Sequence, residues 1–155
     1  MFAKIISVGL FGMEAYMTGV EADISGGMPR FDVVGLPDTA VSESRERVRS
    51  AIKNNGLDFP PSRITINLAP ADIKKEGPIY DLPILIAILK STGQLSCDTD
   101  SSAFLGELSL NGEVRRINGV LPMVIKAQRC GVKEIYIPAP NAAEGAVVRG
   151  ITVYP

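Results

Sequence analysis

The stretch from Ile64 to Ser91 constrains the fold more than any other part of this chain. Its first residues, Ile-Thr-Ile-Asn-Leu, alternate apolar and polar side chains, which predicts a strand with one buried face. A loop from Ala69 to Pro78 follows, and then a helix of about 12 residues from Tyr80 to Ser91. The run Leu-Pro-Ile-Leu-Ile-Ala-Ile-Leu makes this helix apolar almost all round. We expect it in the core, because an exposed helix of this kind would aggregate.

The residues before this stretch predict a meander of strands followed by an amphipathic helix. Segments 3–9, 16–25 and 31–35 are rich in β-branched and aromatic residues and are separated by glycines. Between 19 and 25 apolar and polar residues alternate, so one face of the sheet should be in water. A helix from Asp38, its expected N-cap, to Asn55 carries its apolar residues on one stripe, namely Val41, Val48, Ala51 and Ile52.

The C-terminal part interleaves further strands and a helix. Residues 104–110 and 113–116, joined by Asn-Gly, predict a β-hairpin. Asn118 is the expected cap of a helix that ends near Gly131, and 134–137 and 151–153 are the last two expected strands. The order of elements indicates an α+β domain with a mixed sheet packed by helices.

Composition limits the function more than it defines it. At 155 residues the chain has room for one domain, and its net charge of −1 gives no global attraction for phosphate. There is no histidine, and Cys97 and Cys130 lie far apart, so we expect no metal site. Lys4, Glu14 and two glycines interrupt the apolar N-terminus, which is neither a signal peptide nor a membrane span. We therefore expect a cytoplasmic protein without membrane contact.

Three motifs agree in order and spacing with one known family. They are GGMPRFDVVGLPDTAVSESRERVRSAIKNNG from Gly26, KKEGPIYDLP from Lys74 and FLGELSLNGEVRRINGVLP from Phe104. The chain resembles the N-terminal, ChlI-type and Lon-protease-like domain of the Mg-chelatase-like ComM/YifB family of AAA+ proteins. The resemblance implies a ribosomal protein S5 domain 2-like fold, related to the Lon proteolytic domain, over residues 1–155. It also implies an AAA+ ATPase module beyond residue 155, which would bind ATP and Mg and assemble as a hexamer.

The resemblance to Lon also implies where a catalytic pair would lie. Lon-type peptidases have a serine after a Gly-Pro pair and a lysine further on, and the aligned positions here are Ile79 and Leu121. A Ser-Lys mechanism needs both groups, and the absence of histidine excludes a Ser-His-Asp triad. No GxxxxGK[ST] loop is present for nucleotide phosphates. We therefore expect no catalytic residue and no cofactor in this part of the protein.

Basic residues on the predicted helix are the candidates for binding. Arg45, Arg49 and Lys53 stack on one helical face, where they could contact DNA or a neighbouring subunit. Arg115 and Arg116 would extend this patch if the fold brought them close. The alternative is a plain solvated face, which is what most charge runs are.

The loop before the Gly-Pro junction contains further charged residues. Lys74, Lys75 and Glu76 have, by resemblance, a structural or interfacial role. Asp81 either caps the buried helix, which is the commoner use, or pairs with Lys75. Together with Asp72 it offers too few ligands to assert a magnesium site.

The resemblance implies a non-catalytic domain that aids ring assembly and DNA engagement in a helicase or branch-migration motor. Such a motor would act in recombination or natural transformation. The alternative is an oligomerisation or regulatory module without DNA contact.

Overall fold

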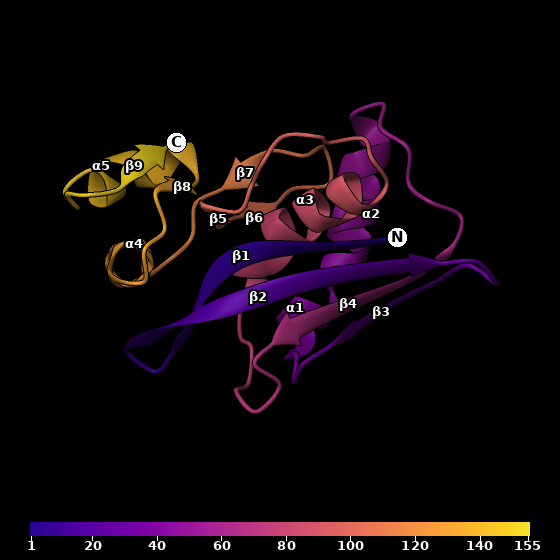
Figure 1. Ribbon diagram of the computed structural model, residues 1–155, viewed down its shortest axis with the longest axis horizontal. Helices are drawn as coiled ribbons and strands as arrows, with labels where there is room; N and C mark the ends of the chain where they lie inside the picture. The colour runs from indigo at the N-terminus through magenta and orange to yellow at the C-terminus, as the bar shows by residue number, and fades with distance from the viewer.

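The computed structural model describes residues 1–155 and is built on one mixed seven-stranded sheet (Figure 1). The strand order is β3-β4-β2-β1-β5-β8-β9. Its N-terminal strands are β1 (Phe2–Phe11), β2 (Glu14–Ser25), β3 (Arg30–Val34) and β4 (Arg63–Ala69). β2 is antiparallel to β1 and β4, whereas β3 is parallel to β4 and β5 is parallel to β1. The predicted α+β class with a mixed sheet is confirmed, and so are the four N-terminal strands.

Two helices cover one face of the N-terminal strands. On β2, Val20, Ala22 and Ile24 are buried while Asp23 and Ser25 are exposed, as the alternation predicted. The helices α2 (Ser44–Asn54) and α3 (Asp81–Ser91) lie together over this face, with α3 in contact with both β1 and β2 (Figure 1).

The most apolar helix lies in the core, as predicted. A short 3-10 turn, η1 (Pro78–Tyr80), leads into α3, where Ile84, Ala87 and Ile88 are fully buried. Neither α3 nor any other helix of the chain has the length and apolarity that a membrane crossing requires.

The helix predicted from Asp38 to Asn55 is divided into two. The first piece is α1 (Thr39–Ser42), and the chain turns at Glu43 before α2 begins. The turn places Ser44 in the core, where its hydroxyl donates a hydrogen bond to Asp81, a partner that sequence periodicity does not reveal. The predicted N-cap is confirmed, because Asp38 Oδ1 accepts from the backbone N–H of Val41 at 2.8 Å. The predicted apolar stripe is also buried: Val41, Val48, Ala51 and Ile52.

The C-terminal half adds three parallel strands and a separate hairpin. The strands are β5 (Ser102–Phe104), β8 (Glu134–Tyr136) and β9 (Thr152–Tyr154), joined through α4 (Val120–Arg129), η2 (Ala139–Asn141) and α5 (Ala142–Gly145). The hairpin consists of β6 (Glu107–Leu108) and β7 (Val114–Arg115). It is shorter than predicted, because Phe104 pairs in the main sheet instead.

The predicted cap of α4 is wrong. The residue before the helix is Gly119, whose φ of 77° lies in the left-handed region that glycine adopts freely, and Asn118 makes no capping bond. The N–H of Leu121 instead donates a hydrogen bond to Glu144 Oε1 of α5 at 3.0 Å.

The helices of this half cover the opposite face of the sheet. Leu10 and Ala15 are paired across β1 and β2, and their side chains point away from the face that carries Tyr16 and Thr18. Leu10 lies against Gly119 at the start of α4, and Ala15 shares a cavity with residues of α4. Gly145 of α5 likewise lies against Ile137 and Val153. Helices α2 and α3 thus lie on one face of the sheet and α4 and α5 on the other, while the outer side of β2 at Asp23 and Ser25 stays exposed.

Candidate functional site

A cavity of about 350 Å³ lies where the Gly-Pro junction meets the β6–β7 hairpin and the loop before α4. Ile79, at the position aligned with the Lon serine, is 8% exposed and is part of the cavity wall. Leu121, at the aligned lysine position, is in the first turn of α4 and is not part of the lining. The lining consists of Leu10, Gly12, Glu76, Gly77, Pro78, Ile79, Glu107, Arg116, Ile117 and Asn118. None of these side chains is a hydroxyl, thiol or amine nucleophile. The lack of peptidase activity stays a prediction.

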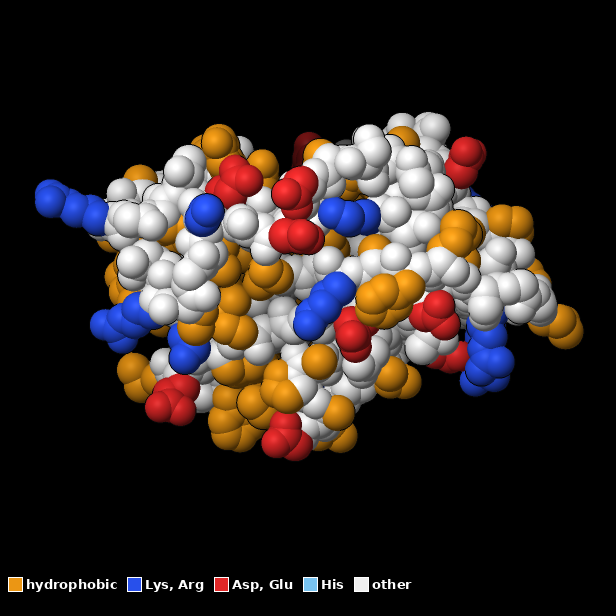
Figure 2. All heavy atoms as spheres, viewed as in Figure 1, with side chains coloured by type: hydrophobic (Ala, Val, Ile, Leu, Met, Phe, Trp, Pro, Cys, Tyr) orange, Lys and Arg blue, Asp and Glu red, His pale blue; other side chains and the backbone are white.

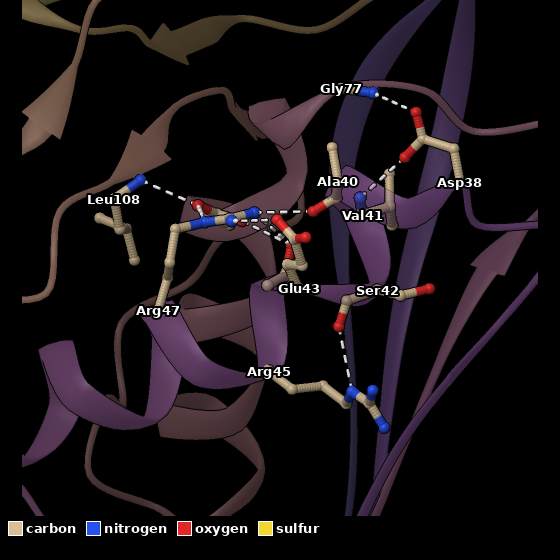
Figure 3. A network of polar contacts seen from close by, with 11 residues as sticks. Asp38, Ala40, Val41, Ser42, Glu43, Arg45, Arg47, Gly77 and Leu108 are labelled. Atoms are coloured by element: carbon tan, nitrogen blue, oxygen red, sulfur yellow. Dashed lines mark hydrogen bonds and ion pairs between the residues drawn. The ribbon is translucent and has the colours of Figure 1, made fainter.

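Two polar side chains fix the backbone around this cavity. Asp38 bonds the N–H of Val41 through Oδ1 and the N–H of Gly77 through Oδ2 at 3.1 Å (Figure 3). Asn141, which is 1% exposed, donates to the carbonyl of Ile117 at 2.8 Å and accepts from its N–H at 3.1 Å. Sequence reasoning predicted the cap by Asp38 but not its second bond, and it missed Asn141, because these bonds join residues distant in the chain.

Asp81, at the start of α3, anchors a buried ionic network to which Arg47 and Leu108, both labelled in Figure 3, belong. Its carboxylate accepts from Arg47 Nε at 2.5 Å, from the Ser44 hydroxyl at 2.5 Å and from the N–H of Leu108 at 3.0 Å. Both predictions for Asp81 are therefore wrong: it is the first residue of α3, makes no capping bond, and does not pair with Lys75. The hydrogen bond to Asp81 raises the pKa of Arg47 above its usual value. One carboxylate thus joins α2, α3 and the β6–β7 hairpin.

Lys75 is buried and makes backbone contacts. Its ammonium group donates to the carbonyls of Gly35 at 2.7 Å, Ile73 at 2.6 Å and Pro70. Burial lowers the pKa of Lys75, and nearby Asp72 opposes that shift in part. The lysine therefore fixes the loop before the Gly-Pro junction to the end of β3. The neighbouring Lys74 and Glu76 are exposed.

Three hydroxyl groups connect β2 with the junction. The Tyr80 hydroxyl lies 2.9 Å from that of Tyr16 and 3.4 Å from that of Thr18, and Tyr80 is fully buried. Burial raises the pKa of both tyrosines. Gly9 leaves the space that the two rings occupy, because a Cβ there would collide with the Tyr80 hydroxyl. The cluster fixes η1 against the sheet.

The predicted basic residues of α2 lie on the side turned to β3. Arg45 donates to the carbonyls of Ser42 at 3.0 Å and Phe31 at 3.3 Å. Arg49 lies over the Phe59 ring at 5.3 Å and is 3.9 Å from Glu46. Lys53 is exposed, as is Arg45, and the side chain of Arg49 is 40% exposed. Arg45, Arg49 and Lys53 are called the α2 ridge below.

The arginines of the hairpin have different neighbours. Arg115 is exposed on β7, where it pairs with Glu107, and Arg116 lines the junction cavity. The contacts of the α2 ridge are instead with Phe31 and Phe59, so the two sets of basic residues share no contact that would support one continuous patch. Asp72 is exposed, whereas the oxygens of Asp81 are already bonded, so these two do not form a shared cation site. No group of three or more metal-ligating side chains is present.

Comparison with known proteins gives a consistent result. The family described as subunit ChlI of Mg-chelatase matches residues 20–141. Competence protein ComM of Haemophilus influenzae is 40% identical over 98% of this chain and 30% of its own length. YifB of Escherichia coli is 44% identical over 90% of the chain and 28% of its own length. Lon protease 2 of Thermus thermophilus is 29% identical over 79% of the chain and 16% of its own length. The chain thus spans less than a third of these relatives.

Proposed function

Because this chain belongs to the ChlI family of Mg-chelatase subunit domains, in its ComM/YifB branch, we propose that it is a non-catalytic domain of a larger ATP-driven DNA motor. The motor would be a helicase or branch-migration enzyme of recombination or natural transformation. One relative is named a competence protein, which supports natural transformation as the process. ATP and Mg would bind to an AAA+ module outside these 155 residues, and the full protein would assemble as a hexamer. The domain would aid ring assembly and contact DNA.

The observation that carries the DNA contact is the arrangement of the α2 ridge. Arg47 points into the protein and forms an ion pair with Asp81. Arg45, Arg49 and Lys53 instead keep their charges at the surface. On the face shown in Figure 2, basic side chains are scattered among acidic and apolar ones, with no broad basic field. A local set of cations on one helix is therefore the best candidate for a phosphate contact.

Charge reversal on the full-length protein tests this proposal. The variant R45E/R49E/K53E should bind a labelled DNA at least about 10-fold more weakly, and the slope of log K against log salt should fall by about 2 to 3, because three phosphate contacts are lost. The matched control R129E/K133E/R149E changes three exposed cations elsewhere on the domain and should stay within about twofold of the wild type. Equal effects of the two variants would show that the ridge has no special role.

The non-catalytic part of the proposal has its own test. A fluorophosphonate probe labels activated serines and should label neither the wild type nor an Ile79→Ser variant, because no lysine side chain lines the cavity. Stoichiometric labelling of the wild type would contradict the proposal.

An oligomerisation or regulatory module is the second candidate. It is favoured by the exposed aromatic side chains of Tyr136 and Tyr154 on neighbouring strands, at 37% and 43% exposure. DNA affinity that is unchanged on deletion of the domain, together with loss of the ring in light scattering, would favour this second function.

A further inference from the structure

One edge of the sheet carries an aromatic face that the helices of the chain cover only in part. Phe104, Tyr136 and Tyr154 stand side by side on β5, β8 and β9 and pair in register. Their rings stack with centroids 4.9 Å and 5.0 Å apart. Exposure rises along the stack, from 7% at Phe104 to 37% at Tyr136 and 43% at Tyr154. The stack therefore begins in the core and ends in solvent.

This aromatic face borders an apolar groove of about 390 Å³. Its lining also includes Leu82 and Ile86 of α3 and Leu95 in the loop that follows. Asp98 is the one charged residue in the lining. Apolar surface in such a groove, next to a half-exposed aromatic stack, is unfavourable in water and indicates a covered surface.

The connections within this chain do not cover the groove. Strands β5, β8 and β9 are parallel neighbours, and the helices that link them, α4 and α5, lie on the other face, where Gly145 lies against Val153. The β6–β7 hairpin in the first link contributes Val114 to the groove lining but leaves Tyr136 and Tyr154 exposed. Crossovers between parallel strands are right-handed, so links that advance in the same direction along a sheet stay on one face. Residues 1–155 therefore leave the groove open beside Tyr136 and Tyr154.

We propose that the occupant of this groove is the segment that directly follows Pro155 in the full-length protein, and that it places aliphatic or aromatic side chains in the groove. Pro155 itself lines the groove, so the backbone leaves β9 inside it. The relatives are more than three times longer than the chain, which spans 30% of one of them. A segment tethered at the groove competes at high effective concentration with any free partner. The inference rests on the proposed function only in requiring a longer protein.

A native thiol reports on the groove. Cys97 lines it, and Cys130, at the end of α4, lies outside it; both are exposed in residues 1–155. In the 155-residue chain, which has its own core of 30 buried residues, both thiols should react with N-ethylmaleimide at similar rates. In the full-length protein, Cys97 should react at least about 10-fold more slowly than Cys130, and a Tyr136→Ser/Tyr154→Ser variant should restore most of its reactivity.

Three results would overturn this proposal. They are equal reaction rates of the two thiols in the full-length protein, protection of Cys97 that disappears on dilution, and a reading frame that ends at Pro155. Protection lost on dilution would identify a second copy as the occupant. The experiment contains no DNA, so it is independent of the ridge test: a motor without ridge-mediated DNA binding would still protect Cys97.

Discussion

Helix α2 carries cations of two kinds, and they differ in what their charge does. On its inner side, Arg47 is 19% exposed and donates to the fully buried Asp81 at 2.5 Å. On its outer side, Arg45 and Lys53 are exposed, and Arg49 rests on the Phe59 ring. The inner arginine neutralises a buried carboxylate, so its loss would leave an uncompensated charge. The outer residues can be replaced at little cost in stability and are free to serve a ligand.

Removing the charge of Asp81 should produce the largest effect. Asp81→Asn removes the buried anion bound to Arg47, leaves it only the exposed Glu43 at 3.6 Å, and should lower the free energy of unfolding by about 3 to 5 kcal/mol. Urea unfolding of the 155-residue chain measures this. The control Glu46→Gln removes an exposed carboxylate of α2 that is 3.9 Å from Arg49 and should cost less than about 0.5 kcal/mol. If both variants unfolded alike, the distinction between the two sides of α2 would be wrong.

Adjacent lysines in the loop before the junction repeat this contrast. Lys75→Met removes three hydrogen bonds to backbone carbonyls and should cost about 2 to 3 kcal/mol, partly offset because no charge is then buried. Lys74→Met changes an exposed residue and should cost less than about 0.5 kcal/mol. The urea concentrations at the unfolding midpoints of the two variants are compared. A loss of stability for Lys74→Met as large as that for Lys75→Met would contradict the contrast between the two lysines.

The sequence predicted the strands and the buried helices but not the polar contacts that join them. Alternation and apolar runs are local, so they placed β2, α3 and the buried stripe of α2 correctly. The bond from Arg47 to Asp81 joins residues 34 positions apart, and that of Asn141 to Ile117 joins residues 24 apart. No short-range pattern marks such pairs. Because Arg47 lies among other charged residues of one helix, its buried role could be recognised only once the fold had placed Asp81 beside it.

Alkaline pH should weaken the fold through the tyrosine cluster by a smaller amount. Burial raises the pKa of Tyr16 and Tyr80, so above pH 10 the unfolded chain loses these protons first and stability falls. The slope should approach about 1.4 kcal/mol per pH unit for each group that stays protonated only in the folded state. The pKa of Lys75 is lowered in the folded protein, so this lysine makes stability rise with pH until its unfolded-state pKa near 10.5 is passed. Urea unfolding between pH 8 and 11 should show a flatter decline for Tyr80→Phe, and identical curves would contradict the assignment.

The smallest effects are expected on the outer side of α2. Arg49→Ala removes a cation over the Phe59 ring and a weak contact with Glu46, and should cost about 0.5 to 1 kcal/mol. Lys53→Ala has no such partner in the structure and should stay within about 0.5 kcal/mol of the wild type. Urea unfolding in low and high salt separates the two contributions, because salt screens the Glu46 contact but leaves ring packing nearly unchanged. A cost for Arg49→Ala close to that of Asp81→Asn would mean that the ridge is a structural element, which would weaken its assignment as a DNA contact.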